Sequence, residues 1–220
     1  AGNTDSEANK IDLTVGGDMM IEQGGAIDVR RKGYGKKMGP GAMTINGYAP
    51  SYGGKGKNNN ANEGQLCYGS IASPTNLSSG SYHDVGSGAV RLTAGGTFAH
   101  YGEITADGLG GYGGVTLPDY YSGAGGSIWI TAGNLIGDGA IRANGGDYLI
   151  DHPGGGGRIA LVLSQATGFS GFSGSVEARG GKNVSSLTEQ VPASGAGTIF
   201  RRTANERRDM GTVTVDNDGG

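Results

Sequence analysis

The sequence of 220 residues has little cysteine, proline or large aromatic side chain: one Cys, six Pro, one Trp and four Phe. The single cysteine, Cys67, excludes an intrachain disulfide. No apolar run approaches the roughly 18 residues of a membrane-spanning helix, so no membrane span is expected. The formal net charge is only −3. This balance argues against nucleic acid as a partner, because binding phosphates requires a basic surface.

Glycine is abundant instead, with 48 residues, whereas the average protein has about 7 %. Proline is too scarce, and glycine too irregularly spaced, for a collagen triple helix. Leu, Ile, Val and Phe are sparse for a compact globule. The composition therefore predicts an elongated shape with a narrow interior.

A set of short segments shares one five-residue pattern. It consists of a glycine, one further residue, an apolar residue, a variable residue and a second apolar residue. The segments are GAIDV (25–29), GAVRL (88–92), GEITA (102–106), GSIWI (126–130), GAIRA (139–143), GRIAL (157–161), GSVEA (174–178) and, less completely, GTIFR (197–201). Alternation with a period of two is typical of a strand that buries one face. No segment has a helical stripe, so we predict an all-β chain.

The strand segments come in pairs that recur about every 30 to 40 residues, a spacing typical of repeat folds. A sandwich of hairpins is the alternative, but it gives no reason for the same strand to recur. The sequence therefore predicts a parallel β-helix, a solenoid of about five or six coils with long lateral loops rich in Gly, Tyr and Asn. Glycines would supply the positive φ angles of its bends and let neighbouring coils approach closely. Two inward ladders are expected, one of Ile27, Val90, Ile128, Ile159 and Ile199, the other of Ile104, Ile141 and Val176.

The domain organisation is predicted to be simple. Residues 1–10 form an N-terminal extension, and residues 11–220 form a single domain. Within that domain, residues 30–87 are a large excursion rich in loops. Loops of this length without regular structure are usually functional or mobile.

The ordered set GGSIWITA, GAIRANGG, GGGGRIAL and GSVEARGG follows GEITADG along the chain. This set resembles the glycine-rich, parallel β-helical module of very large extracellular and cell-surface proteins of bacteria, which are adhesin-like. The resemblance covers about residues 11–215. Lys36-Lys37 and residues 57–60 depart from it, because glycine runs are usual there. The resemblance implies a secreted or cell-surface module with a structural or adhesive role, and it brings no catalytic residue.

Our first functional hypothesis is a non-enzymatic extracellular module that assembles into a filament or surface layer through its end strands. The assembly residues would be Ile11, Leu13 and Val15 of IDLTV, and Val213 and Val215 of TVTV. Such alternating strands either cap an end or pair with another chain, because exposed strand edges invite pairing. The partners would be further copies of the chain or flanking domains of a larger surface protein.

The second hypothesis is a carbohydrate-active enzyme or a carbohydrate-binding module. Asp107 and Asp147 follow equivalent strands, which would bring them to one side on neighbouring levels. Glycoside hydrolysis uses two carboxylates about 5–10 Å apart. Aspartates at turns also bond to local backbone amides, so we favour a chain without enzymatic activity.

Two further groups are candidate binding residues. Loop tyrosines could bind extracellular glycans or cover a thin core; they are Tyr48, Tyr52, Tyr68, Tyr120 and Tyr121. Asp216 and Asp218 flank Asn217 near a glycine turn, which is the pattern of a calcium loop, although an ordinary solvated turn gives the same pattern. No other cofactor is expected.

Overall fold

The computed structural model describes residues 6–44, 49–57, 66–110, 122–147, 152–183 and 194–217, which form strands, turns and loops. The wide sheet has seven strands: β1 (Ile11–Val15), β2 (Met19–Ile21), β4 (Ala89–His100), β6 (Ser127–Ile136), β8 (Arg158–Leu163), β10 (Thr198–Arg202) and β11 (Thr212–Thr214). The narrow sheet has four: β3 (Ala26–Asp28), β5 (Glu103–Thr105), β7 (Ala140–Arg142) and β9 (Ser175–Glu177).

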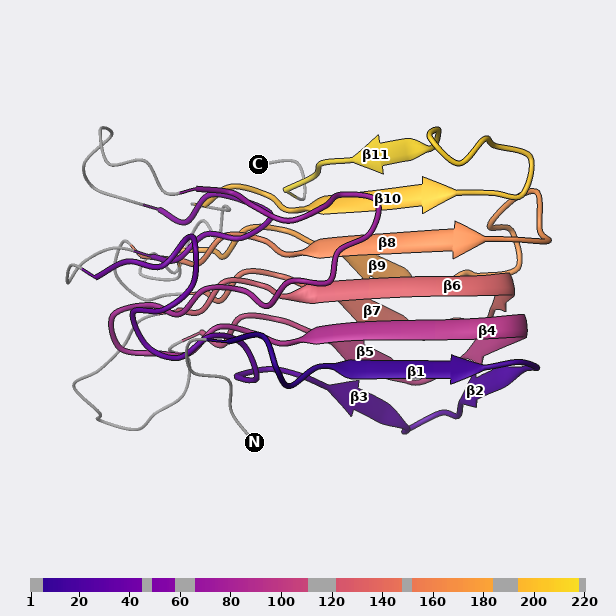
Figure 1. Ribbon diagram of the computed structural model, residues 1–220, viewed down its shortest axis with the longest axis horizontal. Helices are drawn as coiled ribbons and strands as arrows, with labels where there is room; N and C mark the ends of the chain where they lie inside the picture. The colour runs from indigo at the N-terminus through magenta and orange to yellow at the C-terminus, as the bar shows by residue number, and fades with distance from the viewer. Residues whose placement is uncertain are drawn as a thin grey trace.

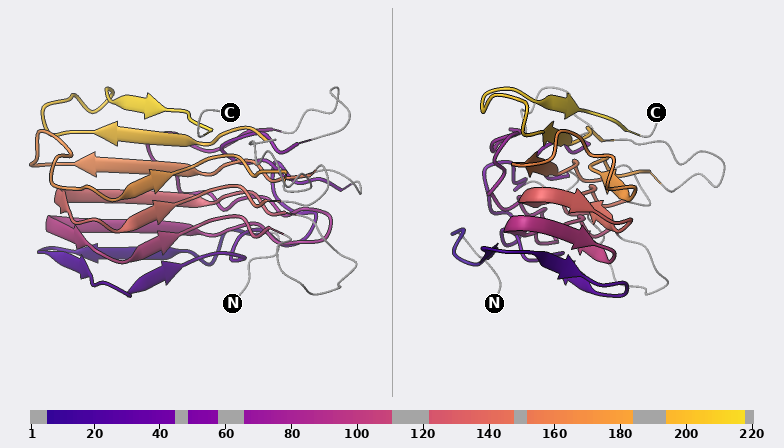
Figure 2. Two further views of the ribbon diagram at one scale, coloured as in Figure 1. Left: turned by 180° about the vertical axis from the view of Figure 1, so that it is seen from behind. Right: turned by 90° about the vertical axis from the view of Figure 1, so that its right-hand side faces the viewer.

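The two sheets form a pair of layers, and from β3 to β10 the chain alternates between them (Figure 1). The wide sheet climbs from β1 to β11 in the order β1-β4-β6-β8-β10-β11, with β2 also paired to β4. The narrow sheet climbs beside it in the order β3-β5-β7-β9, as the view from behind shows (Figure 2). Every pairing is parallel except that of β10 with β11.

The apolar core lies between the sheets and consists of two ladders in register. In the wide sheet, Val90, Ile128, Ile159 and Ile199 pair in succession, and each is at most 7 % exposed. This part of the predicted ladder is confirmed.

Ile27 was placed in the wrong ladder. It pairs with Ile104 in the narrow sheet, above which follow Ile141 and Val176. The first position of the wide-sheet ladder belongs to Ile11, which pairs with Val90. No glycine opens β1, which the sequence indicated by the alternation of IDLTV alone. The β2 segment GDMMI (17–21) has the glycine-based pattern but was not identified.

The predicted parallel β-helix is wrong. The described chain has two sheets, the wide sheet is mixed because β11 runs antiparallel to β10, and no closed solenoid is formed. The longer connecting segments extend to one side of the sheets and run beside one another without a third sheet in the described ranges, while shorter turns join strands on the other side (Figure 1).

These segments meet in what we call the glycine block, which comprises residues 53–54, 123–126, 145–146, 154–157, 180–181 and 195–197. Backbone hydrogen bonds join one segment to the next. Gly54 N donates to Gly156 O at 2.8 Å, and Gly156 N donates to Gly195 O at 3.0 Å. In the same way, Gly146 N donates to Gly123 O at 3.0 Å. The block is therefore held by the backbone itself.

Close approach is the reason that these positions are glycine. A Cβ atom on Gly54 or Gly156 would lie closer than 3.0 Å to backbone atoms of a neighbouring segment. The close approach expected of these glycines is therefore confirmed. The expected positive φ is wrong for the block, since the positive-φ glycines in the described ranges lie elsewhere: Gly24, Gly39, Gly69, Gly137 and Gly211.

Serine takes the place of apolar side chains around the block. The fully or almost fully buried serines are Ser51, Ser78, Ser79, Ser81, Ser87, Ser122, Ser127 and Ser194. Several donate to backbone carbonyls of neighbouring segments, such as Ser78 Oγ to Ala124 O at 2.8 Å and Ser194 Oγ to Gly154 O at 2.6 Å. Because buried polar groups must be hydrogen-bonded, these contacts fix how the segments pack.

The described parts of the predicted excursion 30–87 pack on this region. Ser127 of β6 donates through Oγ to Asn76 O at 2.6 Å, and Leu77 is completely buried. Residues 6–10 of the predicted N-terminal extension are also attached, since Asn76 Nδ2 and Tyr34 Oη each donate to the Glu7 carboxylate at 3.0 Å.

His100, the last residue of β4, is completely buried. Its ring stacks between those of Phe98 and Phe172, with centroids 5.6 and 6.1 Å away. Nε2 lies 3.1 Å from Ala140 O, which only accepts, so we assign the proton of the neutral ring to Nε2. Nδ1 is buried without a hydrogen-bond partner. Burial lowers the pKa of His100 below its ordinary value of 6.5.

The glycine block predicts a large difference between two alanine substitutions. Gly156→Ala should lower the free energy of unfolding by about 2 kcal/mol or more, because the new methyl group overlaps backbone. Gly168→Ala, in an exposed bend where a Cβ meets nothing within 4 Å, should change it by less than about 1 kcal/mol. Urea unfolding of the two variants measures both values, and equal losses would contradict the packing argument.

His100 predicts a pH dependence of stability. Its folded pKa is depressed, so below about pH 6.5 the unfolded chain binds more protons at this site than the folded one. The free energy of unfolding should therefore fall as the pH drops from 6.5 through the folded pKa, and this contribution should be constant above 6.5. Urea titrations from pH 8 to 5 should give a flatter profile for His100→Gln than for the parent chain. Parallel profiles would contradict the assignment.

Candidate functional site

The outward face of the narrow sheet carries two rows of polar and charged side chains. Since Ile27, Ile104, Ile141 and Val176 point inward, their neighbours in each strand point outward. One row pairs Asp28, Thr105, Arg142 and Glu177 in succession. The second row lies two residues further along the chain, just beyond the strand ends. It consists of Arg30, Asp107, Asn144 and Arg179.

Asp107 and Asn144 connect successive levels of the second row. Asp107 Oδ1 accepts from the backbone N–H of Asn144 at 2.6 Å. Asn144 Oδ1 in turn accepts from the backbone N–H of Arg179 at 2.9 Å. Each side chain thus continues the hydrogen bonding of the sheet beyond the end of its strand.

An ion pair and a hydrogen bond link the rows. Arg142 Nε lies 3.4 Å from Asp107 Oδ2, and Asn144 Nδ2 donates to Glu177 at 3.1 Å. Arg142 also pairs with Glu103, two residues before Thr105. Burial raises the pKa of the Asp107 carboxyl, and the Asn144 N–H and the Arg142 guanidinium oppose that shift.

A hollow of about 280 Å³ opens at the end of these rows, and both predicted carboxylates, Asp107 and Asp147, line it with Arg30, Asn144 and Arg179. Asp147 Oδ1 accepts from Arg179 Nη1 at 3.0 Å and from Lys182 N at 2.8 Å. Each carboxylate therefore already holds two donors of the chain. With these donors bound, the two carboxylates connect neighbouring strands and balance the charges of the arginines beside them.

The predicted tyrosines have different positions. Tyr52 is not on a surface: it is completely buried, and burial raises its pKa to about 12. Its hydroxyl lies 2.5 Å from Ser127 Oγ, and because the Ser127 proton goes to Asn76 O, Tyr52 is the donor. Tyr68 is half-buried, packs edge-on against Tyr52 and donates to Leu77 O at 2.7 Å. Tyr48, Tyr120 and Tyr121 lie outside the described residues.

The predicted calcium residues are only partly described, since Asp218 lies outside the described ranges. Asp216 lines a hollow of about 210 Å³ beside Arg201, Thr214 and Glu177. In the ranges that the structure covers, His, Cys, Asp and Glu form no cluster of three or more suited to a metal. The calcium site stays a prediction.

The end strands bound the two ends of the molecule. At the end we call the open end, made by β1, β2 and β3, no described strand pairs with the far edge of β1 or of β3. Ile11, Leu13 and Val15 pair with inward-facing Val90, Leu92 and Ala94, so they share the core face. Leu13 is nevertheless 48 % exposed and Val15 38 %.

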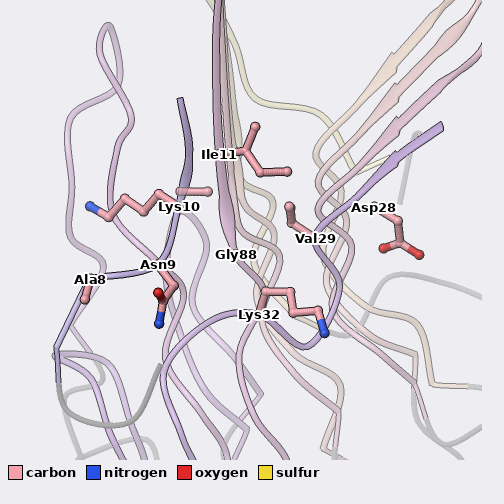
Figure 3. A pocket seen from close by; sticks show the side chains of 9 residues that line it. Ala8, Asn9, Lys10, Ile11, Asp28, Val29, Lys32 and Gly88 are labelled. Carbon is pink, nitrogen blue, oxygen red and sulfur yellow. The ribbon is translucent and has the colours of Figure 1, made fainter. Parts of the chain in front are cut away.

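A hollow of about 320 Å³ lies at this open end. Ile11 of the wide sheet lies on one side of it, and Val29 and Asp28 of the narrow sheet lie on the other (Figure 3). Lys32 also lines it. The sequence patterns did not indicate this hollow, because it arises where two sheets end together.

At the opposite end, which we call the capped end, β11 covers the edge of β10 by antiparallel pairing. Val213 pairs with Phe200 and lies on the outward face, where it is 47 % exposed; Val215 is 64 % exposed. Of the two roles predicted for TVTV, β11 therefore has the capping role here.

A comparison of the chain with protein-family models, with curated proteins and with solved structures finds no match. Within the described ranges, no helix has the length and apolar character needed to cross a membrane.

The Asp107 contacts predict different costs for two substitutions. Asp107→Ala should lower the free energy of unfolding by about 2 kcal/mol, because the Asn144 N–H loses its acceptor. Asp107→Asn keeps an oxygen at that position and should cost less than half as much. Thermal or urea unfolding compares the variants, and an equal loss in both would show that the Asn144 contact contributes little.

Proposed function

We propose that the chain is a non-enzymatic structural or adhesive module that associates with other protein through its open end. The observation that carries this proposal is the exposure of Leu13 and Val15, which are 48 % and 38 % exposed. They lie on the face of the wide sheet that is buried in the core in β4, β6 and β8. Met20, on the outward face of the neighbouring β2, is 60 % exposed. Apolar side chains and unpaired strand edges together are typical of a surface that another strand covers.

The capped end supports the proposal by contrast. There the inward positions of β11, the last strand, are polar, since Thr214 pairs with Ile199 and Thr212 pairs with Arg201. Arg201 Nη1 lies 3.5 Å from Thr214 Oγ1. Polar side chains at the end of a stack of strands keep it soluble without a further layer. The open end has no such layer in its described strands.

An extracellular or cell-surface location is part of this proposal, and the resemblance to the bacterial surface module supports it. The partner at the open end is a second copy or a flanking part of a larger surface protein. The filament or surface layer predicted from both end strands is supported at one end, because β11 is already paired within the chain.

The carbohydrate hypothesis has one observation in its favour, namely that Asp107 and Asp147 line one hollow. Their hydrogen bonds to Asn144, Arg179 and Lys182 favour a structural role for both carboxylates. Carbohydrate binding therefore stays a prediction from the sequence.

The proposal predicts self-association that depends on Leu13. The mean mass from light scattering should rise with protein concentration for the parent chain. Leu13→Lys should abolish the rise, because the charge would be buried in the contact. Thr14→Lys, one residue away on the outward face of the same strand, should leave it intact. A mass of one chain at every concentration, or equal effects of both lysines, would contradict the proposal.

A further inference from the structure

Two arrangements would cover the open end with a second copy. In the first, the open end of one copy stacks on the capped end of the next and continues each sheet upward. In the second, two open ends meet about a two-fold axis. The charges and strand edges of the described residues distinguish between them.

Stacking of an open end on a capped end brings like charges together in the narrow sheet. The register there repeats, so that Asp28, Thr105, Arg142 and Glu177 lie in one row. A second copy added above β9 in this register would place its Asp28 against Glu177 and its Arg30 against Arg179. Like charges directly opposite one another destabilise a pair of strands.

The wide sheet opposes the same stacking. β11 already occupies the edge of β10, so an incoming β1 has no parallel edge of β10 to extend. It would have to lie along β11 instead, whose inward positions are Thr212 and Thr214, and these would face the apolar Leu13 and Val15. Hydroxyl groups covered by apolar side chains lose hydration and gain no partner.

Two open ends are compatible with each other. Antiparallel pairing of β1 with β1 of a second copy, centred on Leu13, places Leu13 opposite Leu13 and Ile11 opposite Val15. On the outward face, Asp12 lies opposite Thr14. In the narrow sheet, pairing of β3 centred on Ile27 sets Ala26 opposite Asp28. No like charges meet, and the apolar side chains that are now exposed cover one another.

We propose that the open end is a self-complementary docking surface, which joins two copies as a closed dimer through antiparallel pairing of β1 with β1. The inference rests on the proposed function, association at the open end, and adds the partner and its orientation. A two-fold contact uses the same patch on both copies and therefore closes. The capped ends of such a dimer point outward.

Disulfide trapping tests the orientation. The exposed Cys67 is first replaced by serine (Cys67→Ser), and Leu13→Cys is then introduced into that variant. Residues directly opposite in an antiparallel pair have Cα atoms about 4.5–5.5 Å apart, within the range of a disulfide. Mild oxidation should therefore yield a covalent dimer and no larger species. Thr14→Cys is the matched control, since Thr14 lies opposite Asp12, and it should cross-link at least about tenfold more slowly.

A second pair of cysteines reports the competing arrangement. Ala26→Cys with Ser175→Cys would be neighbours only if an open end stacks on a capped end, and oxidation would then give a ladder of polymers. That ladder would overturn the dimer but preserve association at the open end. A single-chain mass for the uncross-linked parent in light scattering, together with no cross-linking of Leu13→Cys, would overturn both proposals. Far-ultraviolet circular dichroism checks that each variant is folded.

Discussion

Direct contact between backbones, closer than any side chain permits, is the constraint on which the rest of the structure depends. In the glycine block, amides such as those of Gly54 and Gly156 donate to carbonyls of segments far away in the sequence. A Cβ atom at either position would overlap its neighbours. Glycine loses more backbone entropy on folding than any other residue. Hydrogen bonds that only this close packing allows offset that entropic cost. Buried serines such as Ser78 complete the packing where a hydroxyl fits.

This arrangement divides the molecule into a part held by apolar side chains and a part held mainly by glycine backbone. Between the sheets, ladders such as Val90–Ile128–Ile159 bury apolar area at each level. A stack of this kind has two ends, and each must be closed. Here β11 and the polar residues near Arg201 close one of them, while β1 leaves apolar side chains exposed at the other. The proposed function follows from that asymmetry.

The sequence predicted every strand except β2 and most of their register, because alternation is a local signal. It also indicated that Asp107 and Asp147 share one side, since both follow equivalent strands. The β-helix was wrong because recurring strands indicate which strands pair, and do not indicate whether the segments between them form a further sheet; in the described ranges those segments pack through glycine backbones instead. The sequence left open whether loop tyrosines such as Tyr52 are buried or exposed. The contact of Tyr52 with Ser127 could not be predicted, since it joins residues that no local pattern relates.

Hydrogen exchange of the glycine amides, resolved by NMR, tests the central claim most directly. If backbone packing holds the block together, the amides of Gly54, Gly146 and Gly156 should exchange only on global unfolding, as slowly as those of Ile128 and Ile130 in β6. The amide of Gly168, in an exposed bend, should exchange rapidly. Rapid exchange at Gly54, Gly146 and Gly156 while β6 stays protected would show that the glycine segments are ordinary loops, and would contradict the account.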